Sequence, residues 1–507
     1  MTTTLLVRRF TSDVARNPAT VFVLVATPLV FVVAAAGALA KVGEVLGGSV
    51  AAPAMTRLTA GWSAAFVSGV AMYFQVSSAR QTDQRLAGAG LRRATLVTGR
   101  LLTGVVLALA ATASALVALL IRDGGDHLGR AAAGTVIFAV VYLGFGAVVG
   151  AGVRDPINGT VLLLFVWIVD VFFGPGLNSS PSPLLRGLPT SDAGWWVLQS
   201  PDSTDGSGHL LRALAWATGA LVLAFLAVLA TTARGGRRGG PAGTWAVQLR
   251  VGLRMAWHSR RRTGVLWVLL AVVPAVFIWL AAATTPHGTT AVQVREHGAT
   301  FLASFDPAEI HAGIMAPIAV ASLSALAGVF IGVDARSTDR RLVLAGQRPW
   351  VVATTRLGTT IAATLLATAA ALAVAGVLFN ARQWWVYAAG NTLVAITYGL
   401  LGLLVGPLVG RTGGTLLAFL VPFVDLALGQ SPMLHAQPPP WAVLLPGYGG
   451  NRLVVDGGLT ASFDEGRGLA IALAWLVAIV VVAVARRPVR QATVGGPPSA
   501  TERLAAG

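Results

Sequence analysis

The stretch ARQTDQRLAGAGLRRATLVTGRLLTG, residues 79–104, occurs twice in this chain. Residues 335–360 read ARSTDRRLVLAGQRPWVVATTRLGTT, and 13 of the 26 ungapped positions are identical. Each copy is a charged stretch between two long apolar runs, so the repeat contains a water-exposed connection between membrane helices. The sequence therefore indicates an internal duplication of a membrane unit. The main shared positions are Arg80, Thr82, Asp83, Arg85, Leu86, Gly90, Arg92 and Arg100, matched by Arg336, Thr338, Asp339, Arg341, Leu342, Gly346, Arg348 and Arg356.

The composition excludes several classes of protein. With 55% apolar and only 11% charged residues, the chain has too little polar surface for a soluble globule. It has no cysteine, which excludes disulfides, thiolate metal sites and a cysteine nucleophile. Its single lysine, Lys41, has no G-x-x-x-x-G before it, so the chain lacks a Walker A loop and cannot be an ordinary P-loop ATPase.

The apolar runs predict an all-α polytopic membrane protein with about twelve transmembrane helices, because each span needs ~20 apolar residues. Six spans fall in each half, so the two six-helix repeats enter the membrane from the same side and are parallel. The expected spans are 19–40, 60–79, 101–121, 131–153, 159–174, 210–231, 264–284, 312–333, 357–379, 384–409, 414–429 and 468–485.

The expected domains follow from this count. Residues 1–232 form the first half with an N-terminal amphipathic helix, 233–243 a linker, 244–486 the second half with its own amphipathic helix, and 487–507 a disordered tail. Residues 1–40 also fit a secretory signal peptide. The second half opens in a similar way, however, which favours two retained spans.

Charge predicts the orientation. With both termini in the cytoplasm, 27 of the 37 basic residues fall on the inner side, as the positive-inside rule requires. The basic excess is therefore a topology signal and no evidence for nucleic-acid binding.

The repeated stretch is long enough for a short helix on the inner membrane surface. Thr82 and Thr338 suit its N-cap, and Asp83 and Asp339 its first turn. The alternative is a plain solvated loop whose arginines only fix topology.

An amphipathic helix before span 1, this segment between spans 2 and 3, and a long outer connection containing Leu-Pro between spans 5 and 6 resemble the permeases of ABC-2 type transporters. Two fused six-span units resemble the double-length permeases of actinobacterial antibiotic and multidrug exporters of the tetronasin type. Many members begin the coupling segment with Glu, and this chain has Asp83 and Asp339 instead.

The resemblance implies export of a hydrophobic or amphipathic drug, antibiotic or lipid across the bacterial plasma membrane. ATP and Mg would be bound by a separate ATP-binding subunit, a homodimer, and this permease would hold no cofactor and catalyse no reaction itself. The residues implied to face that subunit are Thr82, Asp83, Arg85, Arg92, Thr338, Asp339, Arg341 and Arg348.

Asp170 and Asp425 are the only acids inside apolar runs, at equivalent places of spans 5 and 11. A charge at mid-bilayer costs ~2.5–3.5 kcal/mol on insertion scales, so each should face protein or water. They either line the translocation path or cap a re-entrant helix formed by the following loop. The long loops 175–209 and 430–467 are where such re-entrant helices are expected.

His287, His297 and His311 share one outer loop, but their spacing matches no compact metal site. The main rival function is a proton-coupled carrier of the major facilitator type. That family needs a Gly four residues before the Asp, where this chain has Ala79 and Ala335. A membrane enzyme would cluster carboxylates on an inner loop, and no such cluster is present in the sequence.

Overall fold

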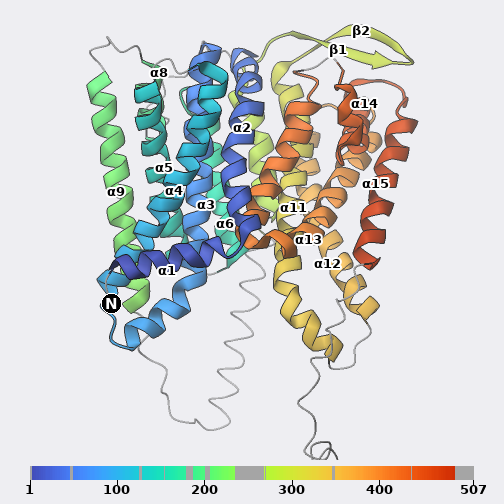
Figure 1. Ribbon diagram of the computed structural model, residues 1–507. Helices are drawn as coiled ribbons and strands as arrows, with labels where there is room; N and C mark the ends of the chain where they lie inside the picture. The colour runs from blue at the N-terminus through green and yellow to red at the C-terminus, as the bar shows by residue number, and fades with distance from the viewer. Residues whose placement is uncertain are drawn as a thin grey trace, which may run out of the picture.

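The computed structural model describes residues 3–45, 50–124, 128–153, 155–177, 187–199, 206–233, 268, 270–344, 349–434 and 437–485. Within these residues, eight helices are long and apolar enough to cross a bilayer. The prediction of an all-α polytopic membrane protein is therefore confirmed. The helices lie side by side with nearly parallel axes (Figure 1).

Every described secondary-structure element in the first half of the chain is a helix. Its helices are α1 (Thr3–Ala15), α2 (Pro18–Val45), α3 (Ala52–Gly88), α4 (Arg93–Asp123), α5 (Leu128–Gly152), α6 (Pro156–Phe172), α8 (Ser191–Leu198) and α9 (Gly206–Ala233).

The second half adds a small hairpin to the helices. A short apolar helix, Leu270–Thr284, precedes it. The remaining elements are β1 (Thr290–Glu296), β2 (Ala299–Phe305), α11 (Pro307–Leu344), α12 (Pro349–Leu378), α13 (Trp384–Pro422), η1 (Phe423–Gly429), η2 (Pro440–Leu444), α14 (Tyr448–Leu459) and α15 (Gly466–Ala485).

Not every expected span is a separate long helix. Spans 5 and 7 fall on the shorter apolar helices Pro156–Phe172 and Leu270–Thr284. Spans 10 and 11 fall on one helical stretch, Trp384–Gly429, broken only at Gly410. Span 2 falls on α3, which is buried almost continuously from Met55 to Val76. The count of twelve stays a prediction.

The amphipathic N-terminal helix is present as expected. In α1, Leu6 and Phe10 are buried, while Arg8 and Arg9 are exposed. The helix lies across the ends of the bundle, roughly perpendicular to the long helices (Figure 1). The linker 233–243, except Ala233 itself, the tail 487–507 and the second amphipathic segment lie outside the described residues.

Matched glycines bring helices together in both halves. A Cβ on Gly146 of α5 would overlap the carbonyl oxygen of Gly69 in α3, and a Cβ on Gly402 of α13 would overlap that of Ala325 in α11. Gly146 and Gly402 are 256 residues apart, as are the two copies of the repeated stretch. Small residues permit this close backbone approach in membrane bundles, so the duplication preserves the packing as well as the sequence.

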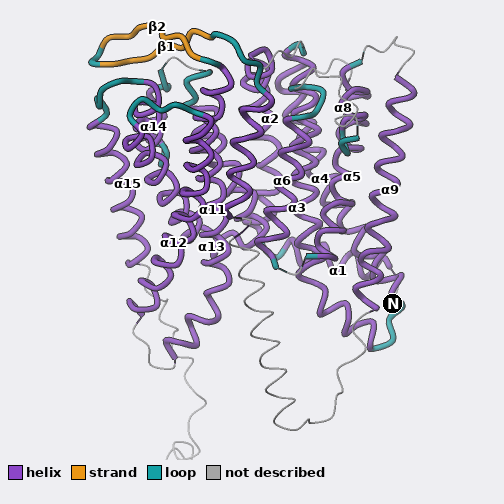
Figure 2. The backbone as a smooth tube through the Cα atoms, turned by 180° about the vertical axis from the view of Figure 1, so that it is seen from behind, coloured by secondary structure: helices purple, strands orange, loops and turns teal. Residues whose placement is uncertain are grey.

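The two halves lie side by side (Figures 1 and 2) and meet through aromatic side chains. Around Phe419 of α13 pack Phe66 of α3 and Trp167 of α6, with ring centroids 5.0 and 5.1 Å away. Phe31 of α2 stacks on Phe423 of η1 at 5.2 Å. Such pairs add ~0.5–1.5 kcal/mol each beyond burial, so the interface is a packed core.

Candidate functional site

The first copy of the repeated stretch is not a separate surface helix. Helix α3 continues unbroken from Ala52 to Gly88, so Thr82 lies inside a helix and is not an N-cap. A short turn with Gly90 in the left-handed region, φ 94°, then leads into α4. Helix α11 likewise continues from Pro307 to Leu344. The expectation of short, separately capped helices was wrong because the apolar run and the polar stretch share one uninterrupted helical backbone.

The end of α3 and the beginning of α4 form one projecting tip, and the end of α11 and the beginning of α12 form another. Both tips extend beyond the body of the bundle on the side where α1 lies (Figure 1). We call them the first tip (residues 79–100) and the second tip (residues 335–344 and 349–356). Figure 2 shows the same projection from behind.

Within the first tip, Asp83 faces the protein. Its carboxylate accepts two hydrogen bonds from Arg100 of α4, from Nε at 3.1 Å and Nη2 at 2.9 Å. Asp83 is 4% exposed, and the Arg100 guanidinium also lies 3.6 Å from the ring centroid of Phe10 in α1. A bidentate pair of this kind is directional as well as charged, so it fixes α3, α4 and α1 relative to one another.

The second tip repeats the pair. Arg356 of α12 donates to Asp339 of α11 from Nε at 2.9 Å and Nη2 at 2.7 Å, and in both tips the partners are 17 residues apart. The side chains of this pair are 28% and 27% exposed, against 11% and 5% in the first tip. The two tips therefore share the Asp–Arg pairing, but both bonds of Arg356 go to Oδ1 of Asp339, and this second pair is less deeply buried than the first.

Hydrogen bonds join the first tip to two further helices. The Arg80 guanidinium donates to the carbonyl oxygens of Gly150, at 2.8 Å, and Ala151 at the end of α5. The Gln84 amide donates to the carbonyl oxygen of Thr231 near the end of α9, at 3.0 Å. A cation at a helix C-terminus satisfies carbonyl groups that lack an intrahelical partner. A displacement of this tip would therefore be transmitted to α4, α5 and α9.

The other predicted residues of the first tip point to solvent. Thr82, Arg85 and Arg92 are exposed. Beside Thr82 opens a cavity of about 390 Å³ between α1, α3 and α4, with Arg9, Asp13 and Arg100 in its wall. The surface that a partner could contact is thus formed by Thr82, Arg85, Arg92 and the polar face of α1. Asp83 contributes to it only by holding the helices in place.

The second tip is described less completely. Arg341 is exposed, Thr338 lies within α11 with no described side-chain environment, and Arg348 lies outside the described residues. Whether any of these residues contacts a partner stays a prediction.

Asp170 lies at the end of α6 and is 1% exposed. Its carboxylate accepts hydrogen bonds from the Tyr142 hydroxyl at 2.9 Å, the Thr190 hydroxyl at 2.6 Å and the Thr190 backbone N–H at 3.3 Å. Thr190 is the N-cap of α8 and follows directly on Leu188-Pro189. A carboxylate at a helix N-terminus satisfies a backbone donor and complements the helix dipole.

Asp425 in η1 has the same arrangement and is also 1% exposed. It accepts from the Tyr398 hydroxyl, from the Gln430 amide and from the backbone N–H of Gly447 at 2.8 Å. Gly447 is the N-cap of α14 and follows Leu445-Pro446. In both halves one carboxylate therefore joins a tyrosine to the start of the helix in the long loop. This geometry fits the capping alternative, and a role in translocation stays a prediction.

Tyr142 and Tyr398 were not identified as site residues from the sequence, although a signal for them exists. They are 256 residues apart, like the two copies of the repeated stretch. Arg100 and Arg356 were recognised as shared residues, but nothing in the sequence named their partners. Tyr142 and Tyr398, like Arg100 and Arg356, are identical polar residues separated by the repeat offset of 256.

The described histidines near the β1–β2 hairpin take part in pairwise contacts. Among the residues that the structure describes, no group of three or more potential ligands comes together. His311 is buried in α11 and contacts the Thr285 hydroxyl at 2.6 Å, while His287 pairs with Asp306 at 2.8 Å. A hydrogen bond from His287 lowers the pKa of Asp306, and the same bond raises the pKa of His287.

No protein-family model matches this sequence, and no curated protein matches it. Function has therefore to be inferred from the geometry of the chain itself.

Proposed function

We propose that this chain is the membrane-spanning permease of an ABC-2 type exporter, with twelve spans in two parallel six-span halves. It would lie in the bacterial plasma membrane with both termini in the cytoplasm. It would export a hydrophobic or amphipathic drug, antibiotic or lipid, using ATP and Mg held by a homodimeric ATP-binding subunit.

One observation carries this proposal. Two tips with the same Asp–Arg pair project from the two halves on one side of the molecule, the side of α1 (Figure 1). A homodimeric partner presents two equivalent surfaces, and a duplicated pair of tips is the matching arrangement on a single chain. The absence of a Walker A loop in the sequence agrees with an energy source on another polypeptide.

The internal contacts suggest how force at the tips would reach the membrane body. Closure of the partner would displace the exposed surface at Thr82 and Arg85 in the first tip and at Arg341 in the second. The pairs Asp83–Arg100 and Asp339–Arg356 would make the helices of each tip move together. Rocking of one half against the other would then separate the aromatic contacts around Phe419.

Contacts between the halves on the side of α1 restrict this motion. The Thr20 hydroxyl of α2 donates to the carbonyl oxygen of Val409 in α13 at 2.9 Å. Just beyond Val409, Gly410 has φ 73° and ψ −176°, a backbone conformation almost confined to glycine. We infer that this break in α13 is the hinge at which the second half bends against α2.

The proposal is tested by purifying the tagged chain from native membranes and identifying what accompanies it. A protein with Walker A and Walker B motifs should co-purify with the wild-type chain. The double variant Arg85→Glu, Arg341→Glu should retain it poorly, because both side chains are exposed on the tips. Arg467→Glu, an exposed residue of α15 far from the tips, is the matched control.

Two outcomes would contradict the proposal. The chain alone in liposomes could transport its cargo on an ion gradient, as a proton-coupled carrier would. The tip variants and the control could also retain the ATP-binding protein equally well.

A further inference from the structure

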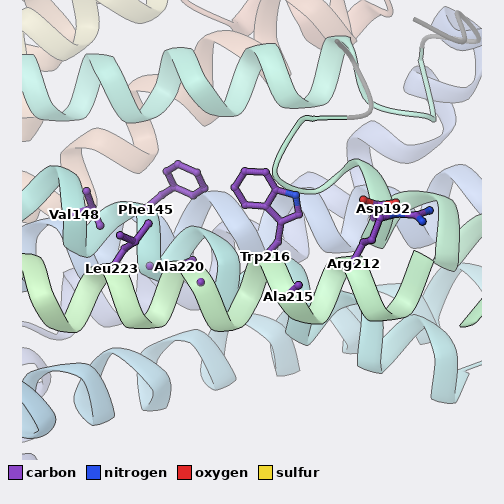
Figure 3. Close-up of a pocket in the computed structure, with 10 residues that line it drawn as sticks. Phe145, Val148, Asp192, Arg212, Ala215, Trp216, Ala220 and Leu223 are labelled. Carbon is purple, nitrogen blue, oxygen red and sulfur yellow. Dashed lines mark hydrogen bonds and ion pairs between the residues drawn. The ribbon is translucent and has the colours of Figure 1, made fainter. Parts of the chain in front are cut away.

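A groove on the first half runs between α5 and α9 (Figure 3). It has a volume of about 510 Å³, within the ~300–1,000 Å³ usual for ligand sites. Its wall is apolar along most of its length, with Phe145 and Val148 on one side and Trp216 and Leu223 on the other. Only one end carries charge, where Asp192 of α8 and Arg212 of α9 meet (Figure 3).

Small residues form the floor of this groove. Gly144 of α5 lies so close to α9 that a Cβ there would be 2.6 Å from the Cβ of Ala220. On the α9 side, a Cβ at Gly219 would have no other atom within 4 Å. The groove is therefore open to the outside of the helix bundle at Gly219.

The length of the groove along α9 matches the thickness of the hydrocarbon layer of one membrane leaflet. Arg212 and Leu223 are 11 residues apart on α9, or ~16 Å at 1.5 Å per residue. Half of a ~30 Å hydrocarbon core is ~15 Å. The charged end lies toward the end of α9 farthest from α1 (Figure 1), so the groove runs from the headgroup level of that leaflet toward the midplane.

The charged end is suited to an anion. Asp192 is buried and already bonded, to Arg212 Nε at 2.8 Å and His209 Nδ1 at 2.7 Å. The Arg212 side chain remains 59% exposed, and its Nη1 has no hydrogen-bond partner among the described residues. Asp192 thus orients Arg212 while leaving part of its guanidinium available to a phosphate.

The small residue that forms the α5 side of the groove is not repeated at the matching position of the second half. At the offset of 256 that pairs Tyr142 with Tyr398, Gly144 and Phe145 are replaced by Leu400 and Leu401. Leu400 is 2% exposed, so the second half has a large buried side chain where the first half has Gly144. The glycine that gives the groove its floor is therefore particular to the first half.

We propose that this groove binds one anionic phospholipid from the leaflet opposite α1. Its phosphate would lie on Arg212, and one acyl chain would follow Trp216, Gly219 and Leu223 between α5 and α9. Moving an acyl chain out of water contributes ~0.8 kcal/mol per buried methylene. Here the acyl chain comes from the surrounding bilayer and not from water, so recognition of the headgroup provides the selectivity.

The test uses the full chain, without any partner, in nanodiscs of phosphatidylglycerol or of phosphatidylcholine, followed by native mass spectrometry. One phosphatidylglycerol should remain bound to the wild type. Gly219→Phe should abolish this adduct by filling the groove, whereas Gly358→Phe on α12, whose Cβ also meets no atom within 4 Å, should retain it. Arg212→Gln should weaken phosphatidylglycerol binding about fivefold, the effect of one basic residue, and Arg467→Gln should not.

An equal adduct in the wild type and Gly219→Phe would overturn the proposal, as would no adduct at all in phosphatidylglycerol nanodiscs. Equal retention of phosphatidylcholine would overturn the role of Arg212. Because the experiment contains no ATP-binding protein, its failure would leave the exporter proposal untouched, and failure of that proposal would leave the lipid site untouched.

Discussion

At the level of single residues, the duplication is most visible in charged pairs. Asp83–Arg100 and Asp339–Arg356 join the same residue types at the same spacing, but only the first is buried, and only in the first are both carboxylate oxygens bonded. A buried ion pair gains little on its own, yet removing one partner leaves an uncompensated charge and is costly. The two pairs therefore allow the residue types and their spacing to be held constant while burial changes.

Asp83→Ala is expected to lower the free energy of unfolding by about 3 kcal/mol, because it strands Arg100 in a buried site. Asp339→Ala should cost about 1 kcal/mol or less, because solvent screens its pair. The measurement is denaturant unfolding of the purified chain in detergent. Asp13→Ala, which removes an exposed partner of Arg16, is the control and should leave stability unchanged. Equal losses for Asp83→Ala and Asp339→Ala would show that burial of the first pair has been misjudged.

Tyr142→Phe and Tyr398→Phe should each destabilise the chain by about 1.5–3 kcal/mol, because each removes a hydroxyl that donates to a buried carboxylate. Tyr73→Phe is the comparison. Its hydroxyl donates to the neutral carbonyl oxygen of Asp155 at 3.0 Å, so the cost should be about 1 kcal/mol. Unfolding in the same detergent measures all three. A smaller loss for Tyr142→Phe than for Tyr73→Phe would contradict the role given to Asp170.

The sequence identified Asp170 and Asp425 because acids are rare in apolar runs. It could not identify their partners, since Thr190 and Gly447 lie some twenty residues further on in loops whose path depends on tertiary packing. Asp83 was expected at the surface because its neighbours are polar. It is buried because α4 turns back along α3 and brings Arg100 onto it.

At the level of helices, the sequence predicted least well where each helix ends. The polar stretches were expected to interrupt the apolar ones, but α3 and α11 run through both without a break. Conversely, α13 has one break inside an apolar stretch, at Gly410. Polarity marks where a helix leaves the membrane, whereas backbone conformation decides where it ends.

Gly410→Ala is expected to destabilise the chain by about 1–3 kcal/mol, because its φ of 73° and ψ of −176° are strained for any residue with a Cβ. Gly358→Ala should instead stabilise α12 by up to about 1 kcal/mol, because alanine is the better helix former and its Cβ meets nothing there. Thermal unfolding of the two variants should therefore shift in opposite directions. A higher unfolding temperature for Gly410→Ala would contradict the break in α13 at Gly410.

The β1–β2 hairpin was not among the elements expected from the sequence. Val292 and Val294 alternate inward along β1, and His297-Gly298 forms a two-residue turn in which both φ values are positive, 49° and 79°. Alternation and such a turn are the ordinary signals of a hairpin.

Glu296→Ala is expected to free the hairpin, because the Glu296 carboxylate accepts from the Ser462 hydroxyl at 2.6 Å and from the backbone N–H groups of Ser462 and Ala461. Faster hydrogen exchange across residues 290–305 at neutral pH is the readout. Gln293→Ala, an exposed change in the same strand, is the control. Unchanged hydrogen exchange in Glu296→Ala would show that Glu296 does not hold the hairpin in place.

The stabilisation of the hairpin by the Glu296–Ser462 hydrogen bonds should also depend on pH. Hydrogen bonding to Ser462 lowers the pKa of Glu296 below its ordinary 4.5 in the folded chain. Its stabilisation is therefore fully present above pH 4.5 and is lost as pH falls through the lowered folded value. A spin label at the exposed Leu302 should become more mobile only at acidic pH.

For the molecule as a whole, the duplicated tips and the aromatic interface belong to one account. The two matched tips on the side of α1 are two equivalent surfaces for a partner to bind. Displacement of these tips would separate the packed contacts around Phe419. The sequence predicted a duplicated membrane protein of helices. It could not predict the contact between the halves, because Phe31, Phe66 and Phe419 are ordinary apolar residues until the fold brings them together.

The most direct test of this account places a photo-crosslinking amino acid at Thr82 and, separately, at Arg341, in the chain in its native membrane. Both positions are predicted to capture the same protein, one that carries Walker A and Walker B motifs. The same crosslinker at Leu302, on the opposite side of the molecule, should not capture it. Capture of no ATP-binding protein at either tip, from membranes in which the chain is actively exporting, would contradict the account.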